Sequence, residues 1–338
     1  MRRSATGLTL GLIIATAFLA WSGPASAGKL DMSITRFITC DATGQQCVAD
    51  VASYERFMAE YAFGISPKLM APAETLGYSG FYLGLEGSLT PLPSAGSHPG
   101  GYWDTGTSPV GESPDVMFNP AIHVRKGLPW SFEIGSSLNY LAQSELVGLG
   151  GEVKWSLFEG YKKGFRGAMP DIAARGSVVR VLGEADVDMT IIGVDGSISY
   201  NFGLGGQIVF IPYAGFQYLW TIIRTEPLVY RQEPSESATG QVEFQPPDGQ
   251  LWDTTGLSGP NLERMKLFLG FVIQYELLVI TLEVDWGLAQ EWNTTVWDNP
   301  AYYNNAYSVY GSTGPDPDQL TTKVDHMVQI NGGVGMQF

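Results

Sequence analysis

Residues 278–287 read LVITLEVDWG, and the pattern of this stretch predicts the fold. The apolar residues Leu278, Ile280, Leu282, Val284 and Trp286 alternate with Thr281, Glu283, Asp285 and Gly287. Successive side chains of a β-strand point to opposite faces, so the stretch predicts a strand with one apolar face and one charged face. In a soluble β-sandwich the charged face lies outside, whereas in a membrane barrel it lies inside.

The same alternation recurs along most of the chain. We expect strands at Leu76 to Thr90, Asp115 to Arg125, Trp130 to Leu141, Leu146 to Phe158, Asp171 to Leu182, Asp188 to Phe202, Gln207 to Arg224, Arg264 to Tyr275, Leu277 to Ala289 and Lys323 to Phe338. The predicted fold class is all-β: an antiparallel transmembrane β-barrel of about ten strands.

The connections between these strands give a second indication, because bacterial barrels pair short periplasmic turns with longer outer loops. If the last strand ends in the periplasm, the long connections Pro91 to Pro114, Thr225 to Glu263 and Gln290 to Thr322 all fall on the outer side. The turns at Lys126 to Pro129, Gly203 to Gly206 and Glu276 fall on the periplasmic side. Two outer connections, near Gln143 and Glu184, are short, and the periplasmic connection Glu159 to Pro170 is long.

The first residues have the form of an export signal. Arg2 and Arg3 precede an apolar run from Leu8 to Trp21, and Ala25-Ser26-Ala27 fits a signal peptidase site. The alternative is a transmembrane anchor, but the run is shorter than the ~20 residues that a helix needs to cross hydrocarbon. We therefore expect residues 1–27 to be a signal peptide and the mature chain to begin at Gly28.

Residues 28–75 are predicted to form an N-terminal periplasmic segment ahead of the barrel, which takes residues 76–338. Apolar residues recur at helical spacing from Asp50 to Phe63, so a short amphipathic helix is expected there, either capping the periplasmic end or entering the lumen. Cys40 and Cys47 are the two cysteines of the chain. In an oxidising compartment this close pair favours a local disulfide over free thiols or a zinc site.

The end of the chain carries a resemblance to a known family. Val328, Ile330, Val334, Met336 and Phe338 share one parity and finish on the terminal Phe. This pattern resembles the assembly signal of Gram-negative outer-membrane β-barrels. The resemblance covers roughly Leu76 to Phe338 and names an architecture, not a particular member. It implies recognition of Phe338 by the barrel-assembly machinery, residence in the outer membrane and contact with outer-membrane lipid.

Composition narrows the possible functions. The chain of 338 residues is 44% hydrophobic and 16% charged, with a formal net charge of -15. The acidic balance argues against nucleic acid as a partner, because binding phosphates needs the opposite sign. Acidic loops that face water explain the charge.

The alternation places charges of both signs on the inner face of the barrel. We expect a lumen charge network of Glu86, Arg125, Glu133, Glu152, Lys154, Arg175, Asp195, Lys266, Glu283 and Asp285. About ten strands leave a bore close to the size that side chains just fill. Each charge would cost roughly several kcal/mol to bury alone, so the charges should pair across the bore and leave the lumen blocked or very narrow.

No combination of residues predicts catalysis. His98 lies in an outer loop, His123 on the inner face of the second strand, and His326 follows Asp325. Adjacent strand residues point to opposite faces, so Asp325 and His326 cannot form a dyad without a bulge. We expect no enzyme activity, cofactor or metal. Asp316 and Asp318, in an outer loop, are more simply solvated than bound to a cation.

The leading functional hypothesis is a non-enzymatic outer-membrane barrel, structural or adhesive, or a narrow pore for small solutes. The alternatives are a barrel hydrolase and a soluble exported carrier. Outer-loop aromatics would suit contact with sugar, lipid headgroups or protein, although an interface girdle explains such residues equally. They are Trp252, Trp292, Trp297, Tyr302, Tyr303, Tyr307 and Tyr310. The extracellular ligand is not specified by the sequence.

Overall fold

A computed structural model describes residues 28–33, 37–40, 47–49, 51–93, 101–108, 113–159, 169–183, 187–204, 207–225, 262–293 and 321–338. The predicted signal peptide lies outside these residues. So do the two outer-loop acidic residues, His98 and the side chains of the outer-loop aromatics listed above.

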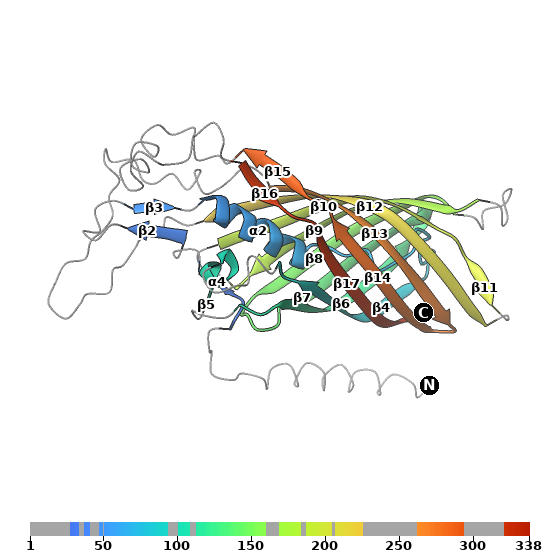
Figure 1. Ribbon diagram of the computed structural model, residues 1–338. Coiled ribbons are helices and arrows are strands. Elements are labelled where there is room, and N and C mark those ends of the chain that lie inside the picture. Colours follow the sequence, from blue (N-terminus) through green and yellow to red (C-terminus); the bar gives the residue numbers. More distant parts are fainter. Residues whose placement is uncertain are drawn as a thin grey trace, which may run out of the picture.

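Ten long antiparallel strands close into a barrel (Figure 1). They are β4 (Phe81–Pro91), β6 (Val116–Leu128), β7 (Phe132–Tyr140), β8 (Val147–Phe158), β9 (Asp171–Leu182), β10 (Val187–Ser199), β12 (Ile208–Thr225), β13 (Leu262–Tyr275), β14 (Leu278–Gly287) and β17 (Met327–Gln337). The strand β10 pairs directly with β12, and the short strand β11 (Phe202–Leu204), which lies between them in the sequence, pairs with the start of β12. The pairing of β17 with β4 closes the ring. The expected fold class and strand count are confirmed.

The remaining elements lie in the connections and in the N-terminal segment. They are β1 (Asp31–Met32), β2 (Ile38–Cys40), β3 (Cys47–Ala49), α2 (Val51–Ile65), α4 (Tyr102–Gly106), β5 (Thr107–Ser108), the 3-10 turn η2 (Pro129–Ser131), β15 (Gln290–Asn293) and β16 (Thr321–Val324). Among the residues described, no helix combines the length and the apolar character needed to cross a membrane.

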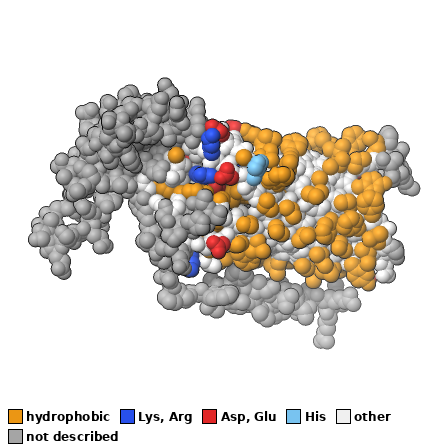
Figure 2. Space-filling model, in the orientation of Figure 1, with side chains coloured by type: hydrophobic (Ala, Val, Ile, Leu, Met, Phe, Trp, Pro, Cys, Tyr) orange, Lys and Arg blue, Asp and Glu red, His pale blue; other side chains and the backbone are white. Residues whose placement is uncertain are grey.

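The wall of the barrel is apolar outside and largely polar inside. Along β14 the exposed residues are all apolar, and the buried residues are Thr281, Glu283 and Asp285 together with Val279 and Gly287: Leu282 is 42% exposed and Glu283 is 1% exposed. Figure 2 shows hydrophobic side chains over most of the barrel wall in that view, with charged side chains gathered toward one end. A soluble protein has the opposite arrangement, with polar side chains outside. An apolar outer wall is what contact with hydrocarbon requires.

The first strand starts later than its sequence predicts. Residues 76–80 do not join the barrel wall, because Leu76 donates its N–H to Glu133 at 3.0 Å and Gly77 turns the chain with a φ of +74°. The strand β4 begins at Phe81, whose N–H donates to the carbonyl of Phe338 at 3.0 Å. The apolar alternation could not reveal this boundary, because it does not show which residues pair with a neighbouring strand.

The position of the N-terminal segment needs a larger correction. We expected the segment on the periplasmic side, with its helix either capping that end or entering the lumen. The helix α2 lies at the end of the barrel opposite Phe338, beside α4 and β16 of the long connections (Figure 1), and its buried face packs on the inner wall, as the second alternative expects. Thr322 on β16 donates to Glu55 of α2 at 2.7 Å. Phe338 and α2 therefore cannot both lie on the periplasmic side. From α2 the chain returns through the lumen to reach Phe81.

Candidate functional site

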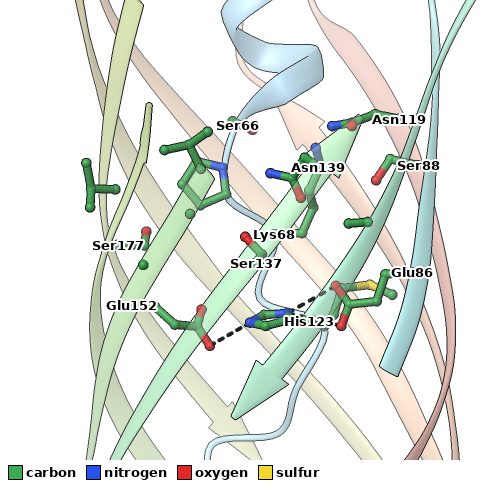
Figure 3. A pocket seen from close by; sticks show the side chains of 17 residues that line it. Ser66, Lys68, Glu86, Ser88, Asn119, His123, Ser137, Asn139, Glu152 and Ser177 are labelled. Carbon is green, nitrogen blue, oxygen red and sulfur yellow. Dashed lines mark hydrogen bonds and ion pairs between the residues drawn. The ribbon is translucent and has the colours of Figure 1, made fainter. Parts of the chain in front are cut away.

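The lumen is occupied by residues 66–80, called the plug segment below. It follows directly from the C-terminus of α2 and runs between the strands toward the end of the barrel where Phe338 lies (Figure 3). Pro67 and Pro72 break any helix here, since proline lacks the N–H that a helix interior needs. The result is an extended chain whose backbone groups must find partners on the barrel wall.

Four cations of the barrel wall donate to carbonyl oxygens of the plug segment. Arg125 reaches Leu69 and Met70 at 3.3 and 3.2 Å, and Arg175 reaches Lys68 at 2.7 Å. Lys154 donates to the carbonyls of Pro72 and Glu74 at 3.1 and 2.9 Å. Lys266 donates to that of Pro67 at 3.1 Å. The barrel thus binds the segment mainly through its backbone, whose carbonyls do not depend on side-chain identity.

The N–H groups of the segment find acceptors on the same wall. Met70 donates to Glu283 and Ala73 to Ser199, each at 3.0 Å, while Thr75 donates to Glu159 at 3.3 Å. Together with the Leu76 contact to Glu133, these bonds run along most of the segment. They account for the charged inner face of the wall, which supplies the acceptors and donors that water would supply in an open pore.

The ten predicted lumen residues come together as ion pairs and hydrogen bonds around the plug segment. Arg125 pairs with Glu86 and Glu152, Arg175 with Glu152 and Asp195, Lys154 with Glu133, and Lys266 with Asp285, at distances of 2.6 to 3.4 Å. Glu283 differs, since no cation lies within ion-pair distance of it among the described residues. It accepts hydrogen bonds from Tyr213, Met70 and Asn331. Five of these six pairs join neighbouring strands of the wall, and Arg125–Glu152 joins β6 to β8. The pairs therefore run along the wall around the plug segment, and not across the bore as expected.

Sequence reasoning missed the plug segment itself and the part that three polar side chains take in the network, although His123 was expected on the inner face. His123 bridges Glu86 and Glu152, Gln217 donates to Asp195 at 3.0 Å, and Tyr213 donates to Glu283 at 2.8 Å. Strand parity places all three on the inner face, so that signal could have found them. Their roles depend on the contacts with neighbouring strands, which parity does not supply.

At the helix end the inner wall is apolar instead of charged. Val179, Val181, Met189, Ile191 and Leu219 are buried there and form one cluster with the buried face of α2. The sequence carries a trace of this, because residues 178–182 read VVRVL, with apolar residues on both faces. A strand that is apolar on both faces indicates a second covering layer, and the layer here is α2.

The helix α2 and the short helix α4 hold one another through a buried carboxylate. Glu60 accepts hydrogen bonds from Trp103 at 2.8 Å and from Tyr102 at 2.9 Å. Burial raises the pKa of Glu60, and these hydrogen bonds together with the nearby Arg56 oppose that rise. Trp103 also packs edge-on against Phe57, with ring centroids 4.8 Å apart. The connection between β4 and β6 is therefore fixed onto the N-terminal segment.

The space left beside the plug segment is small. A polar pocket of about 30 Å³ is lined by Ser66, Lys68, Glu86, Asn119, His123, Asn139 and Glu152, among others (Figure 3). Such a volume holds one or two water molecules. It is too small to form a path for a hydrated solute.

The remaining sequence-predicted sites fall outside the lumen. Asp325 pairs with Arg56 at 2.6 Å, and His326 accepts a hydrogen bond from the N–H of Ala289 at 3.1 Å, so the two side chains have separate partners. Cys40 and Cys47 are direct partners in the β2–β3 ladder. Cα atoms of opposed antiparallel residues lie about 4.5 to 5.5 Å apart, within the span of a disulfide. Their side chains lie outside the described residues, so the disulfide stays a prediction.

A closed ten-stranded antiparallel barrel, apolar outside and filled inside, fits the class of outer-membrane β-barrels. No family model matches the chain, and no curated protein matches it. Among solved structures, the chain matches Ail, the attachment invasion locus protein of Yersinia pestis. It is 7% identical, and the match covers 77% of this chain and 99% of Ail with a TM-score of 0.26.

Proposed function

We propose that this chain is a non-enzymatic outer-membrane barrel with a closed lumen, which anchors an N-terminal unit on the outer face of the membrane. The observation that carries the proposal is the plug segment, whose backbone is hydrogen-bonded to the barrel wall along most of its length. A barrel built to conduct would leave those wall charges to water and solute.

The position of the N-terminal unit supports a structural or adhesive role. With Phe338 at the periplasmic side, the described residues among 28–65 lie at the outer end, where Leu30 donates to the carbonyl of Gln143 at 2.8 Å. Apolar packing of α2 against the inner wall makes this unit part of the barrel, not a loose tail. Such a unit offers a fixed surface for contact with another cell component, whose identity the described residues do not specify.

Planar-bilayer recording tests the closed lumen. The purified protein should give silence or rare small openings, because the plug segment occupies the lumen and the pocket beside it holds only one or two water molecules. Steady, large and weakly selective conductance would contradict the proposal. Lys154→Met removes the wall contacts to Pro72 and Glu74, and Glu283→Gln weakens the contact to Met70 by taking the charge from its acceptor, so both should raise the frequency of openings. Arg180→Gln is a control, because Arg180 is exposed and pairs with Asp188 outside the lumen.

A second experiment tests the outer position of the N-terminal unit. An epitope inserted between β2 and β3, within residues 41–46, should bind antibody on intact cells. An epitope in the η2 turn should bind only after the outer membrane is permeabilised. The reverse pattern would invert the orientation of the barrel, and with it the proposed display.

A narrow pore is the second candidate, and one observation favours it. The hydroxyl and amide groups of Ser88, Ser137 and Asn139 line the polar pocket beside the plug segment, a lining suited to a small polar solute. Small, saturable conductance that Glu283→Gln leaves unchanged would favour this candidate. A barrel hydrolase is tested separately, by assaying lipid and peptide hydrolysis with the purified protein, and we expect no turnover.

A further inference from the structure

His123 on β6 lies between two carboxylates that come from other strands. Its Nδ1 is 3.1 Å from Glu86 on β4, and its Nε2 is 3.2 Å from Glu152 on β8. Figure 3 shows the two contacts on opposite sides of the ring. The ring is only 4% exposed, so no bulk water competes with these contacts.

This geometry identifies the protonation state of the ring. A neutral imidazole has one N–H, and its other nitrogen carries a lone pair. In either neutral tautomer, that lone pair would face a carboxylate oxygen at hydrogen-bond distance, with no proton between them. Only the imidazolium donates to both carboxylates at once.

In the neutral tautomer with its proton on Nδ1, the lone pair of Nε2 would have Arg125 as a donor, because the Arg125 Nε lies 3.4 Å from that nitrogen. The Glu152 oxygen lies nearer to Nε2, at 3.2 Å, and would face the same lone pair with no proton between them. The imidazolium removes this repulsion, and Glu86 and Glu152, which also pair with Arg125, compensate the two positive charges.

The two carboxylates also position the cations that hold the plug segment. Glu86 and Glu152 bind Arg125, which donates to the carbonyls of Leu69 and Met70. Glu152 binds Arg175, which donates to the carbonyl of Lys68. The charged groups that face His123 are therefore Glu86, Glu152 and Arg125, with Arg175 behind Glu152 and Lys68 across the same pocket.

We propose that His123 is a charged latch: its imidazolium joins the strands β4, β6 and β8 to the plug segment, and loss of its proton loosens the segment. The proton passes to water in the adjoining pocket, and the ring then turns a lone pair toward Glu86 or Glu152. The repelled carboxylate moves away and takes with it the alignment of Arg125 or Arg175. This step rests on the proposed function in one respect, namely that the plug segment is what closes the lumen.

The charge of His123 can be measured without altering the lumen. The chain has three histidines, so the double variant His98→Gln, His326→Gln leaves His123 as the single source of ¹⁵N-histidine signals in detergent micelles. An unperturbed histidine, with a pKa of about 6.5, is about nine-tenths neutral at pH 7.5. We expect both ring nitrogens of His123 to be protonated at that pH. A neutral ring at pH 7.5 would overturn the proposal.

The latch itself is tested by bilayer recording as the pH is raised. In the wild-type protein and in His326→Gln, openings should become at least about tenfold more frequent over the pH range in which the ¹⁵N signals show His123 losing its proton, which is a loss of about 1.4 kcal/mol in closure. His123→Lys keeps a positive charge between the carboxylates and should stay silent through that range. If the openings of the wild-type protein stay as rare while His123 loses its proton, the proposed latch is overturned. Steady conductance at every pH would instead refute the closed lumen, and the ¹⁵N result would still stand.

Discussion

At the scale of single residues, the four wall cations each bind both a carboxylate and the backbone of the plug segment. Lys154 pairs with Glu133 at 3.0 Å and also donates to two carbonyl oxygens of the plug segment. Both side chains of the pair are almost fully buried. A buried pair is costly to break from one side only, because the remaining charge has neither water nor a counter-ion.

Lys154→Met should therefore destabilise the barrel by about 3 to 5 kcal/mol. The double variant Lys154→Met, Glu133→Gln should recover part of that loss, since Gln carries no charge and still offers an oxygen to the N–H of Leu76. Urea unfolding in lipid vesicles measures both. Equal losses in the single and double variants would show that the ion pair is not the main contribution.

Leu282 tests which face meets lipid. It lies at the middle of β14 and is 42% exposed. Arg at this position should cost about 2 to 4 kcal/mol, whereas Arg at Leu277, in the turn at the barrel end, should cost about 0 to 1 kcal/mol. The same vesicle unfolding assay compares the two variants. Equal costs would mean that the apolar band does not face a bilayer core.

At the scale of elements, the plug segment is secured where it turns into β4. Gly127 on β6 donates its N–H to the carbonyl of Gly80 at 3.0 Å. A Cβ added at Gly127 would lie 1.8 Å from the carbonyl oxygen of Gly77. The two backbones approach closely only because residue 127 has no side chain.

Gly127→Ala should therefore force the turn away from β6, at a cost of about 1 to 3 kcal/mol. Gly203→Ala is the matched control, because a Cβ there meets nothing within 4 Å, and it should change stability by less than about 0.5 kcal/mol. Thermal unfolding in detergent compares the two. An unchanged unfolding temperature in Gly127→Ala would show that the turn can move freely.

At the scale of the whole molecule, the first and last strands close the barrel. β17 pairs with β4 in a continuous antiparallel register, and Phe338 exchanges backbone hydrogen bonds with Phe81 at 2.8 and 3.0 Å. The rings of these two residues lie 6.5 Å apart. The terminal residue thus belongs to the seam on which closure depends.

Deletion of Phe338 should lower the amount of barrel in the outer membrane several-fold while export to the periplasm continues, because both the closing contact and the expected assembly signal are lost. Immunoblots of fractionated cells measure the two pools. Deletion of residues 41–46, the place of the epitope insertion in the separate experiment, is the control, since they are far from the seam in sequence. Normal outer-membrane levels without Phe338 would refute its role in assembly.

Side-chain alternation was enough to predict the barrel, because its period of two does not depend on what the strand later pairs with. LVITLEVDWG already specifies a lipid face and a lumen face, and the same rule placed all ten lumen charges on the inner wall. What fills the lumen follows only from contacts between segments far apart in the chain. Residues 66–75 carry no periodic signal, since proline and an extended backbone are equally compatible with an exposed linker, and residues 76–80 were predicted as part of the first strand. The place of the plug segment depends on backbone carbonyl and N–H groups, which nearly every residue shares and which no sequence pattern can distinguish.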